Sequence, residues 1–346
     1  MISIAFVNNQ DGSGKTSLVY HLAWMFGELG CRVLMADLDP QAKLSIMALD
    51  EERLEELWTH DDHPVTLSGA LEPLFGGTGD IRDAHVEPIA ERVALLVGDL
   101  ALACLEDALS IAWPRCREGA ERALQVTSSL WRLIEGAARG HEAEVVLIDV
   151  GPNLGAINRA ALIAASHLVV PVSPDLIALQ GLKCLGPTWR QWGETWRQAS
   201  GQSSLEGLAL PRGEMTPIGY VLMRHAERLG RPSRAYEEWQ ARIPAVYRAS
   251  VLGDDSPLPP TTTALCDDQL ALIRHYRGLV PLAMDARKPM FLLKPADGAI
   301  GAHQASVQQC FRDYQTLAEA VARRTGLNWS DRRFHPGPGE SLPTPG

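Results

Sequence analysis

Asn8-Asn9-Gln10-Asp11-Gly12-Ser13-Gly14-Lys15-Thr16-Ser17 is the stretch of sequence that decides the fold of this chain. It follows Ile2-Ser3-Ile4-Ala5-Phe6-Val7, an apolar run of β-prone residues. It leads into residues 15–29, whose apolar side chains recur at the spacing of a helix buried over a wide face, and Gly30 is well placed to end that helix. The sequence therefore predicts a strand, a glycine-containing loop and a helix, in that order.

The loop has the residues of a phosphate-binding site. Its small residues let backbone N–H groups turn toward phosphate oxygens, and the dipole of the following helix favours an anion. Lys15 would reach the β- and γ-phosphates, Thr16 would ligate Mg²⁺ through its hydroxyl, and Ser17 would bond the α-phosphate. The strict Walker pattern fails at Asn9, where a glycine is expected. We expect a nucleotide to bind the six residues Gly12, Ser13, Gly14, Lys15, Thr16 and Ser17; the alternative is a glycine-rich turn with an incidental Lys-Thr pair.

Further strands follow the loop and its helix. Residues 32–36 form a second apolar run, which ends in Asp37-Leu38-Asp39-Pro40-Gln41 at the position where open α/β sheets place their ligands. Val145-Val146-Leu147-Ile148 ends in Asp149 and precedes a helix near 155–166 and a strand near 167–172. Strands that are apolar on both faces are typical of a parallel sheet covered by helices.

We therefore expect an α/β fold of the P-loop NTPase class, in which a mostly parallel twisted sheet is covered by helices on both faces. Residues 50–140 should form a mainly helical insertion with one strand at 92–97, and a C-terminal helical extension should include a helix over 306–324. A long helical stretch is expected near 176–198, bent or broken at Gly181 and Pro187.

The other expected elements complete the chain. A loop is expected at 199–216, a strand at 218–222 and a helix over the arginine-rich segment 224–248. Residues 1–327 should form a single domain. The polar, proline-rich tail at 328–346 lacks the apolar residues to fold, so we expect it to be disordered.

Composition excludes several classes of protein. Of the 346 residues 46% are apolar and 21% are charged, as in an ordinary globular protein, and the net charge of −10 opposes a surface that coats nucleic acid everywhere. The six cysteines form no C-x-x-C pair, which argues against a disulfide framework, a zinc site or a metal cluster. No basic leader and no run of 18 apolar residues is present, so we expect a cytoplasmic protein that is not bound to a membrane.

The motifs together resemble those of the ParA/MinD ATPases. Residues 9–17 are similar to the deviant Walker A motif of that family, x-K-G-G-x-G-K-[ST]-[ST], and residues 32–41 look like its second strand and D-x-D-P-Q switch. Residues 146–155 resemble its Walker B strand and residues 169–174 its next strand. The resemblance covers residues 1–49 and 143–225 with specific motifs and the last third only in outline.

The resemblance implies an ATP-hydrolysing switch that dimerises around ATP, acts in partition or positioning of DNA or a large complex, and has a partner protein that controls hydrolysis. Asp39 would orient or activate the attacking water, with Lys15 as the second catalytic residue. Asp149 would hold Mg²⁺ through its water shell and Asp37 would support the metal site, together with Thr16. Each aspartate could instead be a turn or capping residue.

The chain departs from the family at two neighbouring positions. Gln10 stands where the family has the signature lysine that reaches the partner's nucleotide, and Asp11 replaces a glycine. A neutral amide cannot neutralise charge on a γ-phosphate as an ammonium does. Hydrolysis could therefore be slow or could need a cation from elsewhere, and Gln10 is either a plain loop residue or an orienter of water.

Two further binding roles follow from the resemblance. Met223 and Arg224, at the end of the strand at 218–222, are candidates for contact with adenine, or are ordinary residues at the end of a strand. Non-specific DNA binding is the expected role of a basic set of residues, which could equally pair with Glu227, Glu237 and Glu238. The set comprises Arg224, Arg228, Arg231, Arg234, Arg242 and Arg248.

Two other functions stay open at this point. One is a regulatory nucleotide-binding subunit of a secretion, polysaccharide or defence assembly with slow or no hydrolysis, which Gln10 and Asp11 favour. The other is a small-molecule enzyme such as an ATP-dependent amide-forming or carboxylating synthetase, although residues 224–300 offer no recognisable substrate site.

Overall fold

Eight strands form one sheet in the order β3-β4-β2-β5-β1-β6-β7-β8 in the computed structural model, which describes residues 1–59, 65–201, 208–224, 234–254 and 267–327. All neighbouring strands are parallel except β3, which pairs antiparallel with β4 at one edge. The strands are β1 Ile2–Phe6, β2 Val33–Asp37, β3 Glu87–Ala90, β4 Val93–Leu96, β5 Val145–Asp149, β6 His167–Val172, β7 Thr216–Arg224 and β8 Gln269–Arg274.

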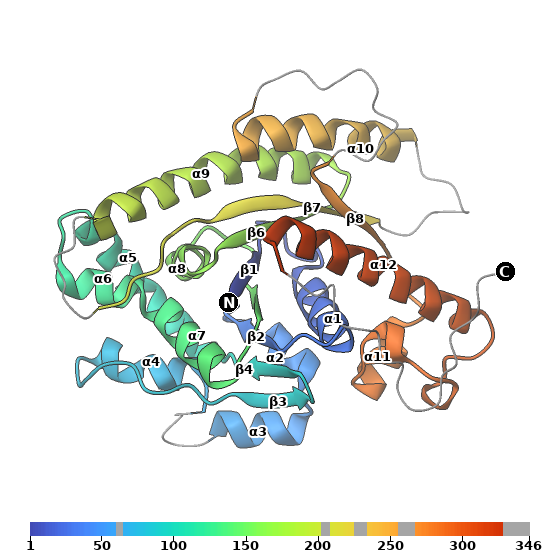
Figure 1. Ribbon diagram of the computed structural model, residues 1–346, viewed down its shortest axis with the longest axis horizontal. Helices are drawn as coiled ribbons and strands as arrows, with labels where there is room; N and C mark the ends of the chain where they lie inside the picture. The colour runs from blue at the N-terminus through green and yellow to red at the C-terminus, as the bar shows by residue number, and fades with distance from the viewer. Residues whose placement is uncertain (60–64, 202–207, 225–233, 255–266, 328–346) are drawn as a thin grey trace.

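Helices cover both faces of the sheet (Figure 1). Ile4 and Phe6 of β1 are buried against one layer of helices, and Ala5 between them is buried against the other. The first layer contains α1 Lys15–Glu28, α2 Lys43–Ala48, α3 Glu51–Thr59, α11 Val280–Ala286 and α12 Ala302–Thr325. The second contains α4 Leu67–Gly76, α5 Glu106–Cys116, α6 Glu121–Thr127, α7 Ser129–Gly140, α8 Ala156–Ala164 and α9 Leu176–Gly201, with α10 Arg234–Val246 outside α9.

The first expected unit is confirmed almost residue for residue. A strand, a loop and a helix follow one another over β1 and α1, and Gly30 adopts the left-handed backbone (φ 87°) just after the helix. Its N–H donates to the carbonyl of Gly27 at 2.9 Å, which closes the helix end. The expected strand, helix and strand of 145–172 are also confirmed, as β5, α8 and β6.

The insertion at 50–140 is mainly helical, as expected, but it contributes two strands to the sheet rather than one. Its strand β4 lies in the main sheet beside β2, and β3, which the sequence did not predict, forms the edge. β3 is only four residues long, and it contains Pro88, which an edge strand tolerates because one side of it needs no partner. Two hydrogen bonds from Arg53 of α3 to the carboxylate of Glu87, at 3.0 and 2.9 Å, hold this edge.

The helix expected near 176–198 is confirmed as α9; a break at Gly181 or Pro187 is wrong, and a bend there stays a prediction. α9 runs as one helix through Gly181 and Pro187, because its buried face packs Leu182, Trp189 and Trp196 into the core, and this burial outweighs the hydrogen bond that proline loses. Gly186 has a separate role. A Cβ atom there would lie 2.0 Å from the carbonyl oxygen of Ser250 in η2 Tyr247–Leu252, a π-helical turn that packs directly on α9.

The last third differs from the expectation at two places. Of the helix expected over 224–248, Arg224 lies in β7 instead, the described helix is α10, and residues 225–233 lie outside the described residues. The strand β8 was missed although Leu270-Ala271-Leu272-Ile273 is an apolar run. The final helix is confirmed as α12. Short 3₁₀ turns complete the structure: η1 Leu100–Leu105, η3 Met290–Leu292 and η4 Pro295–Asp297. Residues 328–346 lie outside the described residues, and a single domain over 1–327 stays a prediction.

The contact at Gly186 yields a test of the packing. We expect Gly186→Ala to lower the free energy of unfolding by about 2 kcal/mol or more, because the new methyl group must push η2 away from α9. Chemical denaturation of the purified protein measures this change.

Gly136→Ala in α7 is the matched control, because no atom lies within 4 Å of the position of its Cβ. It should leave stability unchanged or raise it by about 0.5–1 kcal/mol, since alanine is the better helix former. Equal effects of the two substitutions would contradict the proposed packing.

Candidate functional site

The loop between β1 and α1 is packed tightly from two sides. Gly12 and Gly14 adopt left-handed backbone conformations (φ 69° and 85°). A Cβ on Gly14 would lie 2.7 Å from the methyl carbon of Met223 at the end of β7, and a Cβ on Gly181 of α9 would lie 2.8 Å from Oδ1 of Asn9. Glycine is therefore needed for both backbone shape and close approach.

Hydrogen bonds of Asn8 and Lys15 fix the shape of the loop. The side-chain amide of Asn8 donates to the carbonyl of Pro171 at 2.6 Å, and its Oδ1 accepts from the N–H of Gln10 at 3.0 Å. Lys15 is buried, and its Nζ donates to the carbonyl of Gln10 at 3.3 Å. Burial lowers the pKa of Lys15, and the nearby Asp149 acts in the opposite direction. The ammonium group is thus held inside the loop, where it faces carboxylates.

Asp37 and Asp149 end neighbouring strands and lie opposite each other in the register of β2 and β5. The hydroxyl of Thr16 donates to Oδ2 of Asp149 at 2.6 Å, and the N–H and the hydroxyl of Ser45 both donate to Oδ2 of Asp37 at 2.8 Å. Asp39 accepts from the N–H of Gln41 at 3.0 Å. The structure therefore brings the sequence-predicted acidic residues together beside Thr16 and Lys15.

The two strand-end carboxylates are poised to receive positive charge. Burial raises the pKa of Asp149 to about 8 and that of Asp37 to about 7. Oδ1 of each carboxyl group is buried without a hydrogen-bond partner among the described residues. Two buried oxygens beside a hydroxyl fit the needs of Mg²⁺, which takes oxygen ligands and keeps several of its waters.

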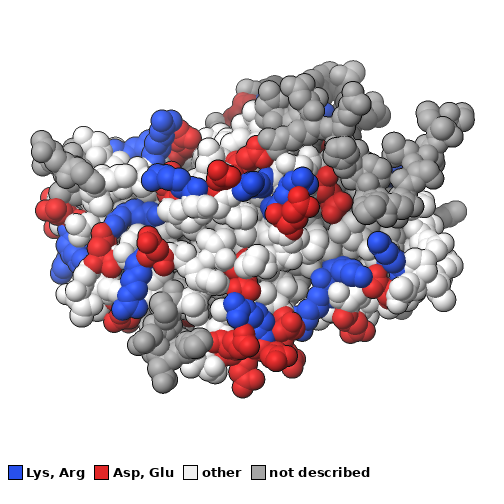
Figure 2. Space-filling model, turned by 60° about the horizontal axis from the view of Figure 1, so that its bottom comes forward, with Lys and Arg blue, Asp and Glu red and all other residues white. Residues whose placement is uncertain are grey.

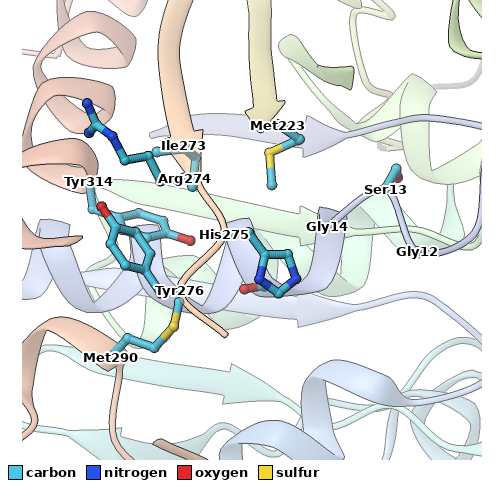
Figure 3. Close-up of a pocket in the computed structure, with 11 residues that line it drawn as sticks. Gly12, Ser13, Gly14, Met223, Ile273, Arg274, His275, Tyr276, Met290 and Tyr314 are labelled. Atoms are coloured by element: carbon cyan, nitrogen blue, oxygen red, sulfur yellow. The ribbon is translucent and has the colours of Figure 1, made fainter. Parts of the chain in front are cut away.

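A cavity of about 140 Å³ opens beside the loop. Figure 3 shows Met223 and Ile273 at its upper side, His275 between Tyr276 and the loop, and Gly12, Ser13 and Gly14 at the other end. The chain thus supplies a partly apolar pocket that is continuous with the glycine-rich loop.

The wall of this pocket is fixed by Asp313 of α12. Its buried carboxylate accepts hydrogen bonds from Arg274 and Tyr276 at 2.6 Å each, and from Gln309 at 2.8 Å. Burial raises the pKa of Tyr276, so its phenol stays protonated and remains a donor. The C-terminal extension therefore shapes the pocket.

His21 joins α1 to the same extension. Its ring stacks on Tyr314, with centroids 5.0 Å apart. Nδ1 donates to the carbonyl of Ser17 at 2.8 Å, and Nε2 accepts from the N–H of Met290 at 3.1 Å, an arrangement that requires the neutral ring. Burial lowers the pKa of His21 to about 4. Arg287 makes a second connection, because its guanidinium donates to the carbonyls of Ile46 and Leu49 at the end of α2.

Large apolar side chains are exposed around the carboxyl edge of the sheet. They follow β4, β5 and β6, and their exposed fractions are 64% for Leu100, 36% for Leu154, 51% for Leu176 and 66% for Ile177. We call these four residues the apolar rim. Exposed apolar side chains can form a surface for protein contact where they lie in one patch.

The structure describes the side chains of only some of the arginines considered for DNA binding. Arg228 and Arg231 lie outside the described residues, as do the side chains of Arg224 and Arg234. Arg242 lies over the ring of Trp239, with 4.8 Å to the ring centroid, and Arg248 forms an ion pair with Asp254. On the face in Figure 2, basic side chains alternate with acidic ones and do not merge into one basic surface.

Several residues of the site were missed by sequence reasoning. Ser45, which holds Asp37, had no motif to mark it, although it lies on the helix directly after the D-x-D-P-Q segment. Arg274, His275 and Tyr276 were missed together with β8, and recognition of its apolar run would have found them at the carboxyl end of a strand. Within the described residues, no three His, Cys, Asp or Glu side chains form a complete metal site by themselves.

None of the helices in the described parts of the chain combines the length and apolar character that a membrane span requires.

Known proteins and a family model match the N-terminal part of this chain. Residues 1–199 match the family model described as AAA domain. Protein IncC of Escherichia coli is 31% identical over 184 residues, which cover 53% of this chain and 44% of IncC. The chromosome-partitioning ATPase Soj of Thermus thermophilus is 32% identical over 179 residues, which cover 52% of this chain and 57% of Soj. The chain therefore spans about half the length of the curated relatives that it matches.

A solved structure shows that the likeness in fold extends over nearly the whole chain. A protein from Corynebacterium diphtheriae has 20% sequence identity and a TM-score of 0.67, and the match covers 94% of this chain and 99% of that one. At this level of identity the match concerns the fold alone.

The buried ring of His21 generates a prediction about pH. Because the folded pKa is about 4 and the ordinary value is 6.5, the unfolded chain takes up the proton first as pH falls. The contribution of His21 to stability is complete above pH 6.5 and should fall by about 3 kcal/mol as pH drops to 4. Denaturation midpoints between pH 4 and pH 8 measure it.

His21→Asn is the comparison variant, because its amide can still donate to the carbonyl of Ser17 but does not titrate in this range. The variant should be less stable at pH 7 and should show a shallower loss of stability toward pH 4. The same pH dependence in both proteins would show that His21 is not the group responsible.

Proposed function

The chain belongs to the ParA/MinD-type P-loop ATPases of the AAA-domain family, and from this we propose that it binds and hydrolyses ATP as a dimerising switch in partition or positioning of DNA or a large complex. The observation that carries the proposal is the joint placement of Lys15, Thr16 and three carboxylates at one edge of the sheet. Phosphoryl transfer needs this combination of positioned cation, metal ligands and water acceptor.

The residues of the loop would bind the phosphates. The segment from Gly12 to Ser17 contains the start of α1, at Lys15. An anion bound there would therefore face both the positive end of the helix dipole and the ammonium of Lys15. Asp39 would orient the attacking water, and the turn made by the N–H of Gln41 holds its carboxylate. The proximity of Asp39 to Gly151, where a Cβ would lie 3.3 Å from Oδ1, places it beside the segment that follows β5.

Mg²⁺ fits the oxygens that the strand ends leave without partners. Thr16 would ligate the ion directly, Asp149 would hold it through its water shell, and Asp37 would support the metal site. When bound, Mg²⁺ neutralises charge on the phosphate oxygens. The hydroxyl of Thr16 would then exchange its hydrogen bond to Asp149 for contact with the ion, and the charge of the ion would favour the ionised form of Asp149.

The pocket of Figure 3 would hold the base of the nucleotide. Met223 approaches the loop from β7, which supports its proposed contact with the base, and His275 and Tyr276 add flat side chains from the end of β8. Apolar and aromatic walls suit a flat heterocycle. Contact by Arg224 stays a prediction from the sequence.

The apolar rim would be the surface on which two copies meet. It follows three strand ends on the edge that carries the phosphate site, so a second copy placed there would also cover the nucleotide. Removal of four large apolar side chains from water would favour such a contact. A partner protein that controls hydrolysis and non-specific DNA binding by the arginines remain predictions from the sequence.

The experiment for the first part compares ATP binding and steady-state hydrolysis in three proteins. Lys15→Ala should abolish binding of ATP, whereas Asp39→Ala should retain binding within a few-fold and lose most hydrolysis, since it removes only the group that orients water. Normal turnover in the Asp39 variant would remove its proposed role. Tight binding without turnover in the unsubstituted protein would favour the regulatory subunit instead.

The experiment for the second part measures mass in solution with ADP, with ATP and without nucleotide. We expect a dimer with ATP only, and Ile177→Asp should prevent it because the rim would then bury a charge. Leu252→Asp is the control, since Leu252 is 38% exposed on η2, in the layer beyond α9. Dimerisation of the Ile177 variant, or loss of the dimer in both variants, would contradict the role of the rim.

A further inference from the structure

Lys43 and Asp11 form an ion pair at the mouth of the glycine-rich loop. Nζ of Lys43 lies 3.0 Å from Oδ1 of Asp11, and the same oxygen accepts a hydrogen bond from the N–H of Gly12 at 2.9 Å. One carboxylate oxygen thus lies between a loop amide and a lysine. An anion that replaced this oxygen on Gly12 would come within hydrogen-bond reach of Lys43.

The pair is exposed and therefore easily exchanged. The side chain of Lys43 is 40% exposed and that of Asp11 is 70% exposed. Ion pairs of this kind contribute about 0–1 kcal/mol, because water competes for both groups. A triphosphate carries more charge than a carboxylate and presents it to the same amide, so it is the stronger partner for the lysine.

Lys43 also belongs to the segment that carries Asp39. It is the first residue of α2, directly after Asp39-Pro40-Gln41-Ala42, and the N–H of Ala42 donates to the carbonyl of Asp39 at 2.8 Å. Ala42 adopts a left-handed backbone (φ 51°), which a residue with a Cβ rarely does. The strained turn at residues 39–42 lies between Asp39 and Lys43 and directs Lys43 toward the loop. The positions of both side chains therefore depend on this one turn.

We propose that Lys43 is a second phosphate-binding cation of this site, held by Asp11 when no nucleotide is bound and transferred to the terminal phosphate of a nucleoside triphosphate. Asp11 then acts as an internal competitor, which occupies both the amide of Gly12 and the lysine until the phosphate displaces it. The inference rests on the proposed nucleotide binding and assigns to Lys43 a charge that Gln10 cannot supply.

The order of groups along the loop favours the terminal phosphate. Ser17 is assigned to the α-phosphate and Lys15 to the β- and γ-phosphates. Gly12 and Asp11 lie farther from α1, so they would face the γ-phosphate end of the triphosphate. ADP has no phosphate there and would leave the ion pair intact. Lys43 should therefore distinguish ATP from ADP.

The test measures dissociation constants of MgATP and MgADP by titration calorimetry. In Lys43→Met we expect affinity for ATP to fall about tenfold, the effect of one lost charge-assisted hydrogen bond, and affinity for ADP to change less than about twofold. Asp11→Asn should tighten ATP binding several-fold, because the competitor is gone. In the double variant this gain should disappear, since it depends on the freed lysine.

Lys288→Met is the matched control. Lys288 pairs with Asp297 at 2.8 Å and is 42% exposed, so it resembles Lys43 in chemistry and exposure, but it lies in the C-terminal extension. It should leave both affinities unchanged. Equal loss of ATP and ADP affinity in the Lys43 variant, no loss of either, or the same gain from Asp11→Asn with and without Lys43 would overturn the proposal.

The outcomes separate the two levels of inference. Unsubstituted protein that binds neither nucleotide would refute the proposed function and the role of Lys43 together. Protein that binds ATP, with a ratio of ATP to ADP affinity that Lys43→Met does not change, would refute the role of Lys43 alone.

Discussion

Two carboxyl groups buried side by side at the ends of β2 and β5 set the strongest constraint on this structure. The parallel register places Asp37 opposite Asp149, and burial raises the pKa of both. Such a pair is costly unless positive charge and donors are supplied close by. The surrounding chain provides them: Lys15 from the loop, the hydroxyl of Thr16 from α1, and the two donors of Ser45 from α2. The loop, the first helix and the segment after β2 therefore all contribute groups that stabilise this buried pair of carboxyl groups.

The parts of the fold that local sequence determines were predictable. β1, the loop and α1 follow from an apolar run, glycines and helical spacing, and the positions of the Asp residues at strand ends follow from the same pattern. Most residues on the loop side of the candidate site were therefore identified from the sequence. The family resemblance then supplied roles that the residues alone left open. What local sequence could not give were the contacts made by distant segments. The roles of Ser45, Asp313 and Lys43 depend on hydrogen bonds to residues elsewhere in the chain. Their partners Asp37, Tyr276 and Asp11 lie 8, 37 and 32 positions away.

The errors in secondary structure have the same origin. Gly181 and Pro187 weaken a helix locally, yet the tryptophans of α9 bury enough area to carry it through, so tertiary packing overrides local preference. β3 is the opposite case: its short sequence, with Glu87, Pro88 and Ala90, has little preference for a strand, and it forms because β4 offers a free edge and Arg53 of α3 binds Glu87. Neither outcome can be read from a window of neighbouring residues.

The support of α1 and α2 by residues near the end of the chain has a consequence for synthesis. Met290 donates to His21, 269 positions earlier, and Arg287 donates to the end of α2, 238 positions before it. Both supports are still missing when the ribosome has made the whole of the phosphate loop and its strands. The candidate site therefore stays incomplete until most of the protein has been translated, and a product that stops before residue 287 would lack the supports of both helices.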